Sequence, residues 1–229
     1  MSTKPRSARP PVDGVWRVGR GPDPLAPHLP DPDTLRTSRL GNRFDSPNAD
    51  YPVLYFSSTL EGCFAETLSR LRPSPSLAKL VRDEWLAMGF MEVGAVPAEW
   101  WQRRSAARVL LDEDYLYLDV ESAETIAYLR TELALGLSSL GYSDLDLGMI
   151  CGPDRRVTRL ISNWAFEQAD EGEPLYGGIR YKSRLGDQWE CWAIFEDAIT
   201  AEVERRSVHP SMAALQSIAS LFELQLHGS

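Results

Sequence analysis

Cysteine is scarce in this sequence, and its distribution argues against disulfide cross-links. The 229 residues include 3 cysteines, Cys63, Cys151 and Cys191, which lie far apart and are odd in number. This usage favours reduced thiols in a cytoplasmic protein. A chain of this length can bury most of the surface that it exposes when unfolded, so it needs no disulfide or metal to fold.

Histidine is equally scarce, which limits both metal sites and acid–base catalysis. The 3 histidines are His28, His209 and His227, and no Cys/His pair has the spacing of zinc ligands. We therefore expect no metal site. Histidine-based general acid–base chemistry is also disfavoured.

The chain also lacks a basic excess and a long apolar run. Its 24 Lys+Arg against 33 Asp+Glu give a net charge of −9, whereas nucleic-acid binders usually carry a basic face. No stretch approaches the ~18 apolar residues that span a bilayer. No apolar run follows the basic residues of Met1 to Pro11, as a secretory signal would require. We expect no nucleic-acid partner and no membrane segment.

Common nucleotide and hydrolase motifs are missing as well. The sequence has no G-x-x-x-x-G-K-[ST] phosphate loop and no G-x-S-x-G nucleophile elbow. Gly19-Arg20-Gly21 begins like a dinucleotide fingerprint, but Pro22 and Pro24 follow, so no helix is expected to start there. Any chemistry is therefore expected to use Arg, Tyr, Glu, Asp and Ser side chains.

Strand and helix patterns are both present. The clearest unit is 52–72, a strand followed by a helix, with a capping-box pattern formed by Ser58 and Glu61. Further strands are expected at 14–19, 85–93, 178–183 and 189–195, and further helices at 98–104, 123–136, 154–170 and 211–226. Strands at both ends with helices between them indicate an α+β fold.

The domain organisation follows from length and local composition. The length predicts one large domain or at most two small ones. Residues 1–14, rich in Pro, Arg and Ser, are expected to be disordered, and a Pro-rich loop covers 22–34. We expect a single domain over 15–229.

A few residues stand out as carriers of chemistry: Arg17, Arg43, Tyr55, Glu66, and Ser183 with Arg184. Each has an ordinary structural explanation when taken alone. Arg43 would be a solvated charge, Tyr55 a core residue, and Glu66, off the apolar stripe of its helix, a surface glutamate. The functional interpretation rests on their joint occurrence.

The order of these motifs resembles that of the RES domain family. Arg43-Phe44, Tyr55 within 53–57, Ala65-Glu66 and the run 178–184 follow the family order, over roughly 15–70 and 150–197. The resemblance implies an ADP-ribosyltransferase-like mixed sheet core with helices packed around it. It also implies an NAD-degrading toxin of a bacterial toxin–antitoxin pair, with an antitoxin of Xre type as partner. A longer middle segment, 73–145, departs from compact family members.

The resemblance gives the candidate residues roles: Arg43, Tyr55, Glu66 and Ser183 in catalysis, and Arg17, Arg43, Tyr55 and Arg184 in NAD binding. Arginine holds a pyrophosphate through bidentate charge-assisted hydrogen bonds, with Arg43 the first choice and Arg17 the second. The Tyr55 ring would stack on the nicotinamide cation. Glu66 would stabilise oxocarbenium character at the ribose, and Ser183 would orient that carboxylate or the ribose.

Three functions stay open at this point. The first is cleavage of the nicotinamide–ribose bond of NAD by a glycohydrolase or phosphorylase, in which NAD is the substrate and no separate cofactor is implied. The second is protein ADP-ribosylation. The third is a non-catalytic module that binds a partner protein such as a helical antitoxin. The 7 tryptophans are also compatible with a homodimer.

Overall fold

The computed structural model describes residues 4–35, 37–76, 88 and 92–227. The strands are β1 (Ser7–Ala8), β2 (Val15–Arg20), β3 (Val53–Ser57), β4 (Ala95–Val96), β5 (Arg104–Leu111), β6 (Leu116–Asp119), β7 (Ala169–Asp170), β8 (Glu173–Pro174), β9 (Tyr176–Ser183), β10 (Gly186–Phe195), β11 (Ile199–Ser207) and β12 (Gln225–Leu226). The helices are α1 (Pro32–Leu35), α2 (Leu60–Leu68), α4 (Ala98–Gln102), α5 (Ala123–Glu132), α6 (Ala134–Ser139), α7 (Leu147–Cys151), α8 (Arg155–Glu167) and α9 (Ala213–Leu221), with 3₁₀ turns η1 (Ser69–Leu71) and η2 (Glu196–Ala198).

One large mixed sheet organises the described part of the chain. Its order is β1-β6-β9-β10-β3-β2-β5-β11, and the β6–β9 pair is parallel while the other neighbours are antiparallel. The central strands β9, β10, β3 and β2 come from distant parts of the sequence. The sheet therefore brings the two regions that carry the candidate site residues side by side.

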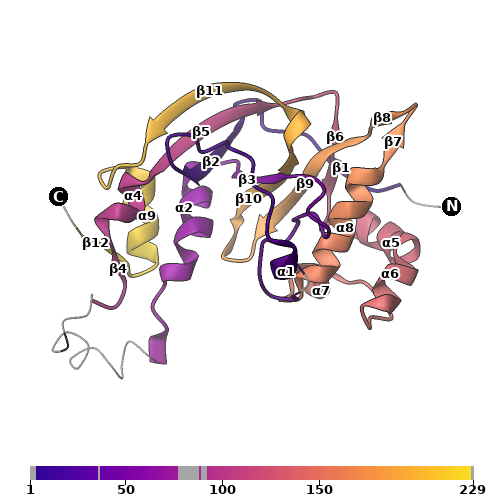
Figure 1. Ribbon diagram of the computed structural model, residues 1–229, viewed down its shortest axis with the longest axis horizontal. Helices are drawn as coiled ribbons and strands as arrows, with labels where there is room; N and C mark the ends of the chain where they lie inside the picture. Colours follow the sequence, from indigo (N-terminus) through magenta and orange to yellow (C-terminus); the bar gives the residue numbers. More distant parts are fainter. Residues whose placement is uncertain (1–3, 36, 77–87, 89–91, 228–229) are drawn as a thin grey trace.

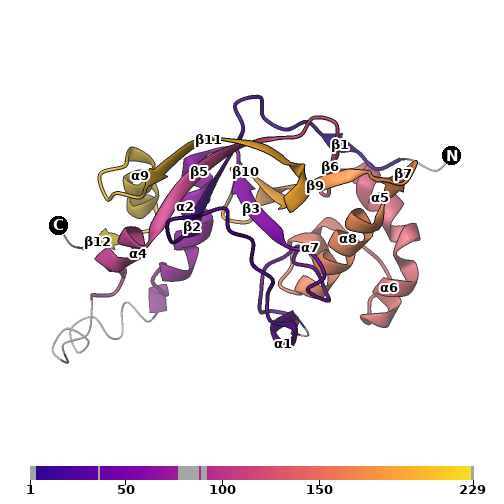
Figure 2. The same ribbon diagram turned by 45° about the horizontal axis from the view of Figure 1, so that its top comes forward.

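Two groups of helices pack against the sheet at opposite ends of the molecule (Figures 1 and 2). Helices α2, α4 and α9 enclose one apolar cluster with Trp189 and Ala106 of the strands. Helices α5 to α8 enclose another, which includes Ile161 of α8 and Ile179 of β9. The α+β class, with a mixed sheet and helices packed around it, is confirmed.

Alternation along β3 decides which side chains face the helices. Val53 and Tyr55 point to the cluster beneath α5 to α8, whereas Leu54 and Phe56 join the cluster on the opposite face of the sheet. Tyr55 therefore lies on the face of the sheet that helices α5 to α8 cover.

The strand and helix expected at 52–72 are confirmed as β3, α2 and η1. The cap is one residue later than expected. Thr59, not Ser58, is the N-cap, and its hydroxyl accepts from the Gly62 N–H. The Ser58 hydroxyl instead donates to Glu190, because the sheet offers it a charged acceptor.

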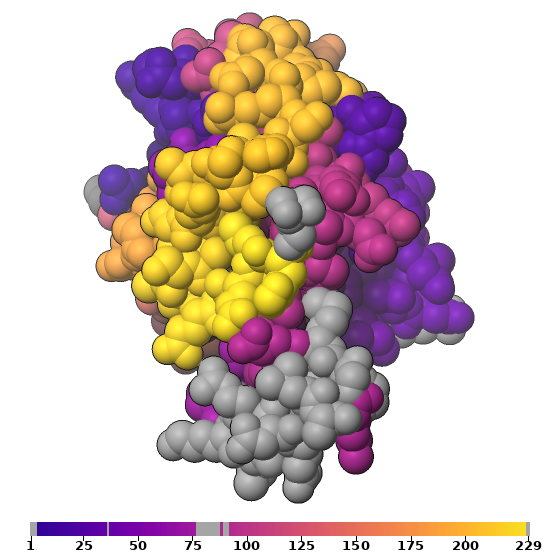
Figure 3. Space-filling view, turned by 90° about the vertical axis from the view of Figure 1, so that its left-hand side faces the viewer, coloured from indigo at the N-terminus to yellow at the C-terminus, as the bar shows by residue number. Residues whose placement is uncertain are grey.

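Both ends of the described chain differ from expectation. Disorder over 1–14 is wrong for its second half, because β1 pairs with β6 and the Arg6 N–H donates to Thr125. The last helix ends at Leu221, and the chain then pairs as β12 with β4. Figure 3 shows the C-terminal segment lying against the magenta segment that holds β4 and α4. The strand expected at 85–93 falls mostly outside the described residues.

Candidate functional site

A cavity of about 760 Å³ opens where the two helix groups separate. Its walls come from β2, β3, α2, η1, the start of α8 and the turn between β9 and β10. This volume lies within the range of small-molecule sites, about 300–1,000 Å³. Arg17, Arg43, Tyr55, Glu66 and Arg184 all line it.

A carboxylate–hydroxyl pair marks one wall of the cavity. The Ser183 hydroxyl, at the buried end of β9, donates to Glu66 Oε1 of α2 over 2.6 Å. Glu66 itself is exposed to the cavity, and its Oε2 has no hydrogen-bond partner among the described residues. The pair therefore holds one carboxylate oxygen fixed and leaves the other open to a ligand.

Arg43 lies beside this pair, almost fully buried. It is 8% exposed, its Nη2 donates to the Ile150 carbonyl over 2.7 Å, and its guanidinium lies 4.9 Å from the centroid of the Tyr181 ring. Its Nε is buried without a hydrogen-bond partner. No carboxylate neutralises this guanidinium within the described residues, so its positive charge is available to the cavity.

Helix α8 holds the loop that carries Arg43. Hydroxyls of Thr158 and Ser162 donate to the carbonyls of Arg43 and Phe44, and Arg159 donates to the Leu40 carbonyl. Gly41 adopts a positive φ of 73°, and a Cβ there would lie 2.6 Å from the Arg159 guanidinium. Glycine is therefore required at this close approach.

Tyr55 is fixed through its hydroxyl. The hydroxyl donates to Asp45 Oδ1 over 2.9 Å and accepts from the Phe44 N–H over 3.0 Å. Burial, and next the Asp45 carboxylate, raise the pKa of Tyr55 well above its ordinary value. The phenol is thus neutral near pH 7, and what it offers the cavity is its ring.

The Arg17 side chain donates its hydrogen bonds to backbone carbonyls of the protein. Its Nε donates to the Pro24 carbonyl over 2.7 Å and its Nη1 to the Tyr55 carbonyl over 3.1 Å. It thereby ties the Pro-rich loop to β3. Burial lowers the pKa of Arg17, but no carboxylate pairs with it in the part of the chain that the structure describes.

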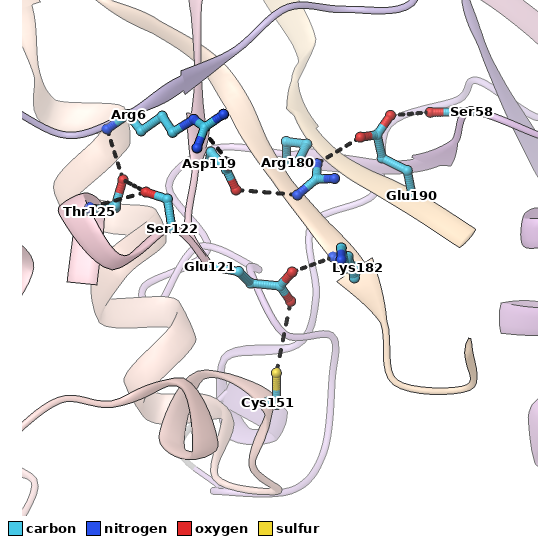
Figure 4. A network of polar contacts seen from close by, with 10 residues as sticks. All are labelled: Arg6, Ser58, Asp119, Glu121, Ser122, Thr125, Cys151, Arg180, Lys182 and Glu190. Atoms are coloured by element: carbon cyan, nitrogen blue, oxygen red, sulfur yellow. Dashed lines mark hydrogen bonds and ion pairs between the residues drawn. The ribbon is translucent and has the colours of Figure 1, made fainter. Parts of the chain in front are cut away.

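A charged network behind the cavity joins the strands to the start of α2 (Figure 4). Arg180 Nη1 donates to Asp119 over 3.3 Å, and Arg180 Nε donates to Glu190 Oε1 over 2.7 Å. Glu190 Oε2 accepts from the Ser58 hydroxyl over 2.7 Å. Because Ser58 directly precedes α2, this network fixes the helix that carries Glu66.

Arginine dominates the lining of the cavity. The arginines are Arg17, Arg20, Arg43, Arg70, Arg104, Arg155 and Arg184, whereas the carboxylates are Asp45 and Glu66. None of these arginines forms an ion pair with a carboxylate of the described residues; the ion-paired arginines all lie elsewhere. Such a set of uncompensated cations is suited to an anionic ligand.

The described residues contain neither a cluster of metal ligands nor a helix that could span a membrane. No group of three or more His, Cys, Asp and Glu side chains that could hold a metal ion occurs in the described ranges. Across those ranges, no helix has the length and apolar character needed to cross a membrane.

The family follows from a comparison over most of the chain. A family model described as the RES domain matches residues 15–214. This chain belongs to the RES domain family. The resemblance drawn from the order of the motifs is thereby confirmed.

This RES-domain protein is also similar to a solved structure. That structure, the M. tuberculosis MbcT-MbcA toxin-antitoxin complex, is similar over 93% of this chain and 92% of that chain, with 12% sequence identity and a TM-score of 0.48. No curated protein matches the sequence.

The RES-domain fold brings the expected site residues together. Arg17, Arg43, Tyr55, Glu66 and Arg184 line one cavity, and Ser183 reaches it through Glu66. Their roles stay predictions. Sequence reasoning assigned no role to Arg20, Asp45, Arg70, Arg104 or Arg155, and it placed Tyr181 in a motif without a role in the site. Nothing in their local sequence distinguishes Arg70 or Arg155 from a solvated charge at a helix end.

Proposed function

We propose that this RES-domain protein is a toxin that cleaves the nicotinamide–ribose bond of NAD. The observation that carries the proposal is the Ser183–Glu66 pair in a cavity lined with unpaired arginines. NAD has an anionic diphosphate and a cationic nicotinamide ring. A cavity that offers a carboxylate together with unpaired arginines suits both groups.

The diphosphate would bind the guanidinium groups that have no protein acceptor. Arg70 and Arg155 donate no side-chain hydrogen bond within the described residues, and Arg184 makes only a 3.4 Å contact to the Cys151 carbonyl. Burial, followed by the nearby Arg184 and Arg70, lowers the pKa of Arg155. A diphosphate would relieve that repulsion and would share the cavity with Arg43.

Bond cleavage would then rely on Glu66. The bond between ribose C1′ and nicotinamide N1 breaks, and its electron pair leaves with neutral nicotinamide. The positive charge that develops on the ribose faces the carboxylate, which Ser183 holds in place. An oxygen of water or phosphate bonds to C1′, and the acceptor then loses its proton where that oxygen carries one. The ring of Tyr55 would stack on the nicotinamide.

A nicotinamide-release assay tests this proposal. We expect purified protein to release nicotinamide from NAD, and Glu66→Gln to lower kcat by about 100-fold, since an electrostatic contact made in the transition state is worth about that much. Glu61→Gln, on the same helix but outside the cavity lining, is the matched control and should keep its activity.

Three outcomes separate the alternatives. Free nicotinamide with ADP-ribose or its phosphate ester supports a glycohydrolase or phosphorylase. Label from NAD retained on a protein supports an ADP-ribosyltransferase instead. Folded protein that leaves NAD intact, with and without phosphate, contradicts both and favours a non-catalytic partner-binding module.

The proposal extends to partner and compartment. A toxin that consumes NAD would deplete the NAD of the cell that makes it unless an inhibitor is bound. We propose an antitoxin of the Xre type for this role. We propose a cytoplasmic location, because the proposed substrate NAD is available there. A homodimer stays a prediction without support from the tryptophans, because Trp100, Trp101, Trp164, Trp189 and Trp192 are all buried within the chain.

A further inference from the structure

The cavity holds a second group of arginines that the diphosphate of NAD does not require. Arg20 ends β2 and Arg104 begins β5, and the two are register partners on adjacent antiparallel strands. Both line the cavity, together with Trp100. Residues opposite each other on paired strands have Cα atoms about 5 Å apart, so these two side chains leave the sheet side by side on the same face.

No carboxylate in the part of the chain that the structure describes neutralises either of these arginines. Arg20 is exposed and forms no side-chain hydrogen bond or ion pair in the described ranges. Arg104 lies 4.3 Å from the centroid of the Trp100 ring and donates one hydrogen bond to the Trp100 carbonyl over 2.6 Å. Burial, and next Arg20, lower the pKa of Arg104. A pair of like charges held together without a counterion is a site that an anion would stabilise.

This pair is separate from the arginines assigned to the diphosphate. Arg20 and Arg104 lie at adjacent ends of β2 and β5, where Arg104 contacts Trp100 of α4, whereas Arg155 begins α8 and Arg184 lies in the turn between β9 and β10. One cavity therefore contains two cationic centres. NAD carries one anionic group, its diphosphate, and would leave the second centre unoccupied.

We propose that this second centre, Arg20 with Arg104, binds a phosphate on the 2′-oxygen of the adenosine ribose, so that the preferred substrate is the phosphorylated dinucleotide NADP. The inference rests on the proposed function and specifies its substrate. A 2′-phosphate adds about −1.5 to −2 charge near pH 7, and arginine is the side chain that accommodates this group in other dinucleotide sites.

Binding of ADP-ribose and of its 2′-phosphate, measured by calorimetry, tests the inference. We expect the 2′-phosphate to bind about tenfold or more tightly, as charge-assisted hydrogen bonds to one phosphate allow. Arg20→Ala should reduce that ratio to near one. This substitution removes no hydrogen bond of the described structure, so the variant is expected to fold.

Arg103→Ala is the matched control. Arg103 is the exposed neighbour of Arg104 and does not line the cavity, so its loss removes the same charge from the same region. The ratio should be unchanged in this variant. A ratio that falls equally in both variants would mean a general field effect and would overturn the inference.

Cleavage assays with NAD and NADP separate this inference from the proposed function. A higher kcat/KM for NADP, lost in Arg20→Ala, supports both. Equal kcat/KM values for NAD and NADP, with equal binding of the two ADP-ribose ligands, overturn the inference and leave the proposed function standing. Absence of cleavage and of binding overturns both, whereas tight binding of the 2′-phosphate without cleavage overturns only the catalytic proposal.

Discussion

At the scale of single residues, burial divides the reactive groups of the cavity into those that can ionise or react and those that cannot. Tyr55 and Tyr181 are both held neutral, because burial raises the pKa of each well above its ordinary value. Glu66 is exposed and keeps a free oxygen. Among these groups, we therefore assign stabilisation of the positive charge on the ribose to Glu66, and a packing role to the two tyrosines.

Cys63 illustrates the same division and gives a testable outcome. It lines the cavity, yet its thiol is 5% exposed and donates to the Trp16 carbonyl over 2.9 Å. Burial raises the pKa of Cys63 to about 12. Because the thiolate is the reactive form, we expect iodoacetamide at pH 8 to modify the half-buried Cys151 before Cys63 and Cys191.

Mass spectrometry of peptides after partial alkylation measures this order. The same reagent in denaturant should modify all three cysteines at similar rates, which serves as the control. Labelling of Cys63 in the folded protein as fast as Cys151 would contradict the burial argument and would reopen a nucleophilic role for this thiol.

The sequence predicted the site residues that lie in a family motif, and it did not predict the other residues of the cavity. Glu66 lies off the apolar stripe of its helix, and that offset correctly indicated a side chain outside the core. Arg155 and Arg104 have no such signal, because what singles them out is that no carboxylate of the described residues forms an ion pair with either guanidinium. That absence exists only once distant strands and helices are packed together.

At the scale of elements, α8 has a central part in building the cavity. One face of the helix packs into the core through Ile161 and Val157, and polar side chains on it fix the loop that carries Arg43. Its first residue, Arg155, lines the cavity. The same helix therefore stabilises the core and places Arg155 in the lining of the cavity.

The N-cap of α8 gives a pH-dependent prediction. Asp154 accepts from the Arg156 N–H over 3.0 Å, and its hydrogen bonds with the Arg156 side chain are the first cause that lowers the pKa of Asp154 to about 2. Removing the cap in Asp154→Ala should lower the free energy of unfolding by about 1 kcal/mol at pH 7. Asp154→Asn keeps an acceptor and should lose less.

The sign of the pH dependence follows from the depressed pKa. The unfolded carboxyl titrates near 3.9, so the charged contribution of Asp154 is complete above that pH and disappears as the pH falls towards about 2. Urea unfolding should show the wild type and Asp154→Asn differing equally at pH 7 and 5, and less at pH 3. A difference that is constant down to pH 3 would contradict the assigned role of the charge.

The elements that sequence predicted are those with an apolar pattern. Strand β3 and helix α2 bury alternate or periodic apolar residues, and both were expected. Strand β11 was missed because it is an exposed edge strand in which Glu202, Glu204, Arg205 and Arg206 replace the apolar alternation. Its position depends on backbone pairing with β5, which the sequence pattern does not reveal.

At the scale of the whole molecule, net charge and local charge have opposite signs. The chain carries a net charge of −9, yet the cavity is lined by arginines that outnumber its carboxylates. The negative total argues against a nucleic-acid partner, which stays an expectation, and it is compatible with a local site for one small anion. An anionic dinucleotide would be drawn specifically to the cavity, because the remaining surface is acidic overall.

The central claim is that one cavity binds a dinucleotide with its nicotinamide ribose at Glu66. A crystal structure of the Glu66→Gln variant soaked with NAD tests it most directly, because this substitution is expected to slow cleavage while keeping the shape of the site. We predict that the hydroxyls of the nicotinamide ribose lie within hydrogen-bond distance of residue 66. We also predict that the diphosphate accepts hydrogen bonds from Arg70, Arg155 or Arg184. A dinucleotide bound outside this cavity, or bound within it with the nicotinamide ribose far from residue 66, would contradict the account.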